Sequence, residues 1–363
     1  MLTHTETGQL TQRDYSACMR WKRPRVRGAS AVLAVLVVVV LAGGALFVVR
    51  NREGGQADRS CRLDAALVPS CGLWWGAALP SRNSQLTVGV AAAEQASGRR
   101  LDIVHTYHRW QDSFPTATES RLSASGRLLF MNWEPVAPDG HDLSWAAIGR
   151  GDQDATIRAE AARLARVGHE VFVSFSHEPE LHYGTHGTTA DFAAAFRRVV
   201  TVSRQAGATN VRWVWDVMGL ADPVWHDRYR TLWPGSAYVD WIGWDPYNSG
   251  NCQHRAWRSF ADTVTPFYDW LQGQAFAAGK PFMLAEYGSV EGSSPAAKAD
   301  WFSSIPAVVA GLPRLKALVY FNLPAPPGNC DWLTATSPRS AGAFAALAGN
   351  PIFRWTATRT APD

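Results

Sequence analysis

The chain has 363 residues, of which 47% are hydrophobic and 18% charged, enough for one barrel-sized domain. The formal charge of +4 is modest, and a basic cluster between Arg20 and Arg27 carries much of it. The rest of the chain has no basic footprint, so no nucleic-acid partner is expected. The 17 tryptophans fit a carbohydrate cleft, because sugar faces stack on aromatic rings, but much of this content is expected to be core packing, so composition supports a sugar site only weakly.

An uncharged segment follows the basic cluster. Residues 29–49 are dominated by Val, Leu and Ala, and as a helix they would span about 31 Å, enough for a bilayer core. The positive-inside rule then predicts a cytoplasmic tail at 1–28, a transmembrane anchor at 29–49 and a linker at 50–60. The domain at 61–363 would lie outside a single-pass cell membrane. A long secretory signal is the alternative, because small residues from Ala42 onward permit cleavage.

Beyond the linker, strand-like and helix-like runs alternate without an internal repeat. The expected strands are residues 73–79, 102–110, 128–133, 171–176, 211–216, 239–244, 282–286 and 318–322. The expected helices 155–167, 190–205 and 259–278 each stop near a glycine, as helix ends prefer. This alternation predicts an α/β fold, a (β/α)8 TIM barrel. A doubly wound open sheet is the competing fold, but no glycine-rich dinucleotide or phosphate loop favours it.

Four of the five cysteines lie on the predicted outer side of the membrane, an even number in an oxidising compartment. Four cysteines allow three connectivities, and the sequence leaves all three open. We favour Cys61–Cys71 with Cys252–Cys330, because the second pair follows strands that a barrel would bring close. No CxxC spacing supports a zinc site, so no metal is expected.

Two glutamates each close a strand-like run. Glu178 follows Val-Phe-Val-Ser-Phe-Ser-His, and Glu286 follows Pro-Phe-Met-Leu-Ala. They end the fourth and seventh expected strands, whose carboxyl ends face each other across a closed barrel. Paired carboxylates there suit glycosidic bond cleavage, in which one acid protonates the leaving oxygen and the other attacks or activates water. A structural ion pair is the alternative for each glutamate.

The segments around these glutamates resemble glycoside hydrolase family 26, whose acid/base and nucleophile lie on strands 4 and 7. The resemblance covers roughly residues 70–350 and rests on 107–108, 127–135, 171–178, 238–248 and 280–288. It implies that Glu178 is the acid/base and Glu286 the nucleophile of a retaining double displacement without a cofactor. Retention places the carboxyls about 5–5.5 Å apart, and Glu178 needs a raised pKa to stay protonated.

The resemblance assigns substrate-binding or orienting roles to five further residues: His177, Tyr247, His108, Trp133 and Tyr183. Tyr247 would hydrogen-bond the nucleophile, Tyr183 would offer an aromatic platform, and His108 and Trp133 would line the sugar pocket. Simple packing is the alternative for each. On a regular strand His177 would point away from its neighbour Glu178.

The expected reaction is endo-hydrolysis of a β-linked polysaccharide. β-1,4-Mannan comes first in this family, with β-1,3-xylan, mixed-linkage glucan or a cell-surface exopolysaccharide as alternatives. Two departures leave mannan open: Pro-Glu-Leu-His-Tyr-Gly follows Glu178 where mannanases tend to carry Asn-Gly and tryptophans, and Tyr320–Pro324 lacks a Trp-Arg pair. A non-catalytic glycan-binding barrel is the competing class of function. The oligomeric state stays open.

Overall fold

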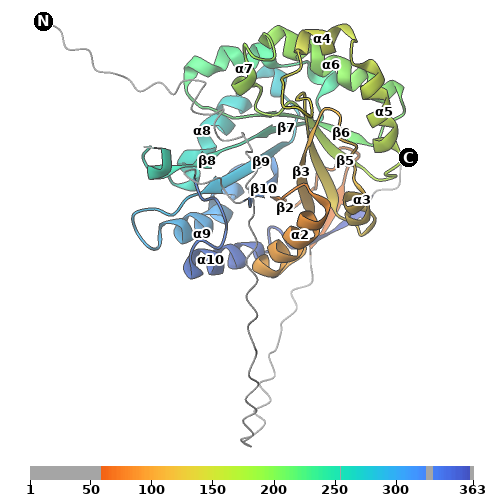
Figure 1. Ribbon diagram of the computed structural model, residues 1–363. Coiled ribbons are helices and arrows are strands. Elements are labelled where there is room, and N and C mark those ends of the chain that lie inside the picture. The colour runs from red at the N-terminus through yellow and green to blue at the C-terminus, as the bar shows by residue number, and fades with distance from the viewer. Residues whose placement is uncertain (1–58, 254, 324–329, 360–363) are drawn as a thin grey trace, which may run out of the picture. The chain divides into compact units, whose positions relative to one another are not determined.

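The structure is a computed structural model that describes residues 59–253, 255–323 and 330–359 (Figure 1). The predicted tail and anchor, with nearly all of the linker, lie outside these residues and stay predictions. Within the described ranges, none of the helices has the length and apolar character needed to cross a membrane.

Eight parallel strands form a closed barrel, which confirms the predicted fold. In order they are β2 (Trp74–Ala78), β3 (Ile103–Arg109), β4 (Leu128–Glu134), β5 (Val171–Phe175), β6 (Val211–Val217), β7 (Trp241–Trp244), β9 (Phe282–Ser289) and β10 (Leu315–Phe321). The barrel closes because β10 pairs with both β9 and β2. The two-residue strand β8 (Tyr247–Asn248) pairs with the end of β9.

Helices surround the strands (Figure 1). They are α2 (Asn83–Ser97), α3 (Ala117–Ala124), α4 (Trp145–Arg150), α5 (Asp154–Ala165), α6 (Thr189–Gln205), α7 (His226–Leu232), α8 (Phe260–Gln272), α9 (Ala297–Ala310) and α10 (Pro338–Ala348). The helix expected at 259–278 is shorter than predicted. It ends at Gln272 because Gly273 caps it, with its amide donating to the carbonyls of the last turn, and a separate 3₁₀ turn follows.

Alternating side chains of the strands build two hydrophobic layers. One side of each strand fills the barrel, with residues such as Trp74, Phe130, Phe172 and Trp241. The other side packs against the helices in a larger core. Strands buried on both faces have continuous apolar runs, which is why they could be recognised in the sequence.

The amino-terminal end of the barrel is covered by the start of the domain. A turn that follows β1 (Arg59–Leu63) accepts side-chain hydrogen bonds at Ala65 and Ala66 from Arg212 and Trp241, at the start of β6 and β7. β1 itself pairs with β11 (Trp355–Arg359), the last described strand. Both favoured disulfides are present, which confirms the predicted connectivity: Cys61–Cys71 beside β1, and Cys252–Cys330 between the loops after β8 and β10.

Candidate active site

Glu178 lies just beyond β5, where the backbone leaves the strand conformation. β5 ends at Phe175, and both Ser176 (φ 50°) and Glu178 (φ 46°) are left-handed, an uncommon conformation for residues other than glycine. The Glu178 amide donates to the Asp216 carbonyl of β6 at 3.2 Å, which holds the turn. The alternation that would turn His177 away from its neighbour applies only to a regular strand, and it does not apply here because β5 ends at Phe175. His177 instead lies beside the second glutamate.

Glu286 is brought to the mouth by an irregularity in β9. Leu284 pairs with Leu318 but Tyr287 pairs with Tyr320, so β9 has one residue more than β10 in this interval. Such a bulge re-aims side chains and often lies next to an active site. Ala285 packs inside the barrel and Tyr287 outside it, and Glu286 sits between them, 4% exposed.

Three donors face the Glu286 carboxylate. The Tyr107 hydroxyl donates to Oε1 at 2.6 Å, and the Tyr247 hydroxyl donates to Oε2. The Nε2 atom of His177 lies 4.0 Å from Oε1. The structure thus places Tyr247 against the nucleophile candidate, as the resemblance implies. Tyr107, whose role the sequence reasoning missed, follows His105 at the two-residue spacing of inward-facing positions on β3.

His177 is held by a further acid. Its Nδ1 atom and the Glu134 carboxylate of β4 form a hydrogen bond, and its amide also faces that carboxylate. Burial opposes the charge of His177, but the carboxylates of Glu134, Glu286 and Glu178 together raise its pKa well above the ordinary value. Burial likewise opposes the charge of Glu134, yet the imidazolium lowers its pKa. The two form a compensated ion pair behind the glutamates.

Glu178 has the electrostatics of an acid rather than of a nucleophile. Its side chain is buried, with 9% exposed, and burial raises its pKa to about 8 against the opposing charge of His177. The neighbouring carboxylates of Glu286 and Glu180 raise the pKa further. At neutral pH Glu178 is therefore mostly protonated and able to donate a proton.

Other acids share this environment. Asp216 on β6 and Asp245 after β7 are buried, and burial raises the pKa of both carboxyls well above the ordinary value. Burial also raises the pKa of Glu180 to about 7, and Glu180 accepts from the Met218 amide at 3.2 Å. The mouth is thus lined with desolvated carboxyl groups that disfavour one another's ionisation.

Two residues that were expected to line the sugar pocket, Trp133 and His108, lie instead on the side of their strands that faces the helices. Trp133 is completely buried, stacks on Trp110 at 4.3 Å and donates from Nε1 to the Trp110 carbonyl. His108 is 4% exposed and lies 2.8 Å from a carboxylate oxygen of Glu119. The prediction that they line the sugar pocket is wrong, because both side chains fall on the outward face of their strands and pack against the helices.

Tyr183 is 42% exposed and follows the 3₁₀ turn Pro179–His182 that begins at the acid. The guanidinium of Arg228, on α7, lies over its ring at 4.8 Å from the ring centre. The same guanidinium lies 4.6 Å from the ring centre of Trp225. The sequence reasoning missed Arg228 and Trp225, since neither lies in a recognisable motif.

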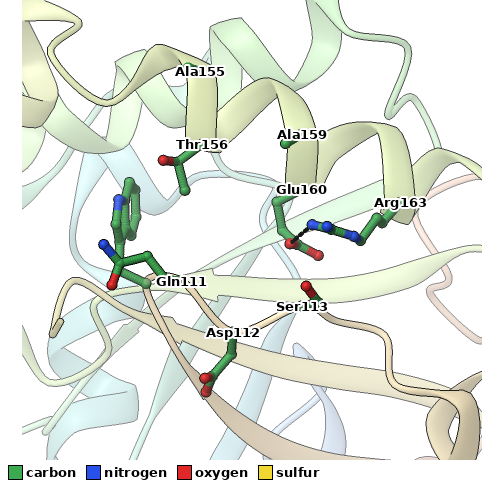
Figure 2. A pocket seen from close by; sticks show the side chains of 9 residues that line it. Gln111, Asp112, Ser113, Ala155, Thr156, Ala159, Glu160 and Arg163 are labelled. Carbon is green, nitrogen blue, oxygen red and sulfur yellow. Dashed lines mark hydrogen bonds and ion pairs between the residues drawn. The ribbon is translucent and has the colours of Figure 1, made fainter. Parts of the chain in front are cut away.

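No group of three or more metal-ligating side chains that could hold an ion occurs within residues 59–253, 255–323 and 330–359. A separate hollow of about 320 Å³ lies between the loop after β3 and helix α5 (Figure 2). None of the paired acids lines it. Glu160 within it is bound to Arg163 and to the Phe114 amide, so this hollow is not the candidate site.

A closed barrel with two buried carboxyls at the ends of its fourth and seventh strands is an arrangement that suits glycosidic bond cleavage. Comparisons with known proteins agree. "Endoglucanase H" of Acetivibrio thermocellus is 28% identical over 308 residues, which are 80% of this chain and 32% of that protein. The chain therefore spans about a third of the length of this curated relative. No family model matches the chain.

Solved structures of family 26 share the fold. A modular endo-β-1,4-mannanase from Cellulomonas fimi superposes with a TM-score of 0.58 at 18% identity, covering 77% of this chain and 71% of that one. The catalytic domain of the family 26 endo-β-1,4-mannanase of Bacillus sp. JAMB-750 gives 0.57 at 15% identity, covering 79% and 87%. These confirm the resemblance to glycoside hydrolase family 26 that the motifs predict.

Proposed function

We propose that this protein is a retaining endo-β-glycosidase that cleaves a β-linked polysaccharide by double displacement. The observation that carries the proposal is the contrast between its two glutamates. Glu286 has its oxygens held by two tyrosine hydroxyls and faces the His177 imidazole. Glu178 is kept protonated by burial. One fold therefore supplies a nucleophile and an acid at the same pH.

The two steps follow from these states. An oxygen of Glu286 attacks the anomeric carbon while the bond to the leaving oxygen breaks, and Glu178 gives that oxygen its proton. Glu178, now ionised, takes a proton from water. The water oxygen attacks the same carbon and releases Glu286. Tyr107 and Tyr247 keep the Glu286 carboxylate in one orientation throughout, and the Glu134–His177 pair supports it from behind.

The substrate class is a β-linked glycan, with β-1,4-mannan and β-glucan as the first candidates. Mannanases among the structural neighbours support the former, and the endoglucanase at higher sequence identity supports the latter. The departures after Glu178 separate this chain from the mannanase pattern. We place the domain outside the cell membrane, held there by residues 29–49. Recovery of the mature protein free in culture medium contradicts that placement.

Incubating the full chain with mannan, β-1,3-xylan, mixed-linkage glucan and cellulose, followed by mass analysis of the products, tests the activity. We expect oligosaccharide products from the wild type and none from Glu286→Ala. Proton NMR of the first products should show the β-anomer. An α-anomer contradicts retention. If the wild type cleaves none of these glycans but binds one, a glycan-binding barrel is the better interpretation.

A further inference from the structure

The cluster of Arg228, Tyr183 and Trp225, called here the Arg228 cluster, is the strongest feature that the reaction does not use. Tyr183 comes from the loop after β5, and the other two come from the segment after β6. β5 and β6 are paired neighbours, so these loops adjoin at the barrel mouth. Figure 1 shows α7 outside the strands, among the helices that surround the barrel.

If Glu178 is the acid of the proposed reaction, this cluster would lie on the leaving-group side of the cleavage point. Glu178 gives its proton to the leaving oxygen, so the departing sugar must lie against the loop that carries Glu178. The 3₁₀ turn Pro179–His182 begins at Glu178 and ends at Tyr183. A sugar one position beyond the cleaved bond would therefore approach Tyr183 and the guanidinium over its ring.

Arg228 differs from Arg230 on the same helix because no ion-pair partner of its charge is found among the described residues. Arg230, two residues further along α7, binds Asp227 at 2.7 Å. Asp222 is also engaged, with its Oδ1 accepting from the Val224 amide at 3.0 Å. Glu180 is the remaining acid nearby. It is buried and accepts from the Met218 amide. Burial raises its pKa, and the charge of Arg228 opposes this rise without an ion pair joining the two side chains.

The guanidinium of Arg228 contacts the faces of the two aromatic rings. These contacts do not use its N–H groups as hydrogen-bond donors, so the N–H groups can bind another acceptor. A guanidinium whose N–H fork is available is suited to bidentate binding of a carboxylate. The two rings add apolar surface on which a pyranose ring can stack. The combination of a sugar-stacking surface and a carboxylate-binding fork fits a uronic acid.

We propose that the Arg228 cluster binds a uronic acid residue of the substrate on the leaving-group side, so that the enzyme selects an acidic β-glycan over a neutral one. This inference rests on the proposed function for the side of the cleaved bond on which the uronic acid lies. The binding of a uronate can nevertheless be measured without hydrolysis. The specificity would come from Arg228, and Tyr183 and Trp225 would hold its guanidinium in place.

The test compares methyl β-D-glucuronoside with methyl β-D-glucoside, which differ in one carboxylate. Binding of each to the full chain carrying Glu286→Ala is measured by NMR titration. We expect the glucuronoside to bind about tenfold more tightly or better, the effect of one charge-assisted hydrogen-bonded pair. Adding Arg228→Gln should abolish the preference. Adding Arg230→Gln, the matched control on the same helix, should retain it.

Arg228→Lys keeps the positive charge but lacks the fork, so an intermediate preference is expected from it. It also carries the test if Arg228→Gln does not fold, which thermal unfolding will show. Equal binding of the two glycosides, or a preference that survives Arg228→Gln, overturns the inference. The two proposals fail separately: absence of hydrolysis on every glycan counts against the enzyme, whereas absence of the binding preference counts against the uronate site alone.

Discussion

Replacing Glu178 by Gln should make the protein more stable at neutral pH while abolishing hydrolysis. In the folded chain burial raises the pKa of Glu178 to about 8, whereas an unfolded glutamate has a value near 4.5. At pH 7 the unfolded chain ionises this group and the folded chain does not, so folding must take up a proton. That uptake costs on the order of 3 kcal/mol at pH 7. Gln has nearly the same shape and is neutral in both states.

The direction in which stability changes with pH follows from the raised pKa of Glu178 in the folded chain. A group with a raised folded pKa contributes full stability below its unfolded pKa and loses that contribution as pH rises through the folded one. The variant and the wild type should therefore be equally stable near pH 4.5. The advantage of Glu178→Gln should grow up to about pH 8 and then level off. Other buried acids such as Glu180 are present in both proteins, but they interact electrostatically with Glu178, so the measured advantage includes the relief of their repulsion with its ionised form.

Thermal unfolding of both full chains at pH 5 and pH 7.5 measures this difference. For a folded unit of this size, about 3 kcal/mol corresponds to an increase of roughly 5 °C in Tm. Glu94→Gln is the control, because that carboxylate accepts hydrogen bonds from Arg127 at 2.8 and 2.9 Å and its loss should not stabilise the fold. A Tm gain independent of pH, or a Glu178→Gln variant less stable at pH 7.5, would refute the reasoning.

Three further outcomes follow from the same geometry. Hydrolysis should decline above about pH 8, where Glu178 loses the proton it donates, and a pH profile of kcat/KM that falls already near pH 5 contradicts this. Tyr107→Phe removes the 2.6 Å hydrogen bond to Glu286. Because a hydrogen bond to a charged group is lost, kcat should fall by about 10- to 100-fold. A change in KM alone would count against this role of Tyr107. Gly243→Ala places a Cβ 2.8 Å from Asp216 Oδ1 and should destabilise the fold by about 1–3 kcal/mol in urea unfolding, so an unchanged midpoint contradicts the close contact.

The barrel itself could be predicted from the sequence, because strands buried on both faces have continuous runs of β-branched and aromatic residues. Strand ends differ from the prediction by a few residues: β10 begins at Leu315 rather than Leu318, and β9 ends at Ser289 rather than Glu286. The longest expected helix ends at Gln272, where Gly273 caps it. The sequence could not tell this glycine from Gly279, which is an equally good stop signal. Local sequence marks such ends only approximately.

The site could be predicted only in part, because the two glutamates depend on irregular backbone. Nothing in the sequence marks Ser176 and Glu178 as left-handed, since neither is glycine. The bulge at Glu286 depends on pairing with β10, a contact between distant segments. The prediction for Trp133 fails although its backbone is regular, because alternation alone does not tell which face points into the barrel.

The donors around Glu286 are compatible with a protonated Glu178. A guanidinium or ammonium group beside Glu286 would also favour the ionised form of Glu178, against the acid role proposed for it. Tyr107 donates a hydrogen bond without adding positive charge. The charge of His177 does oppose the raised pKa of Glu178, but the Glu134 carboxylate bound to its imidazolium offsets much of it. Neutral phenols and a compensated ion pair thus stabilise one carboxylate while leaving its neighbour an acid.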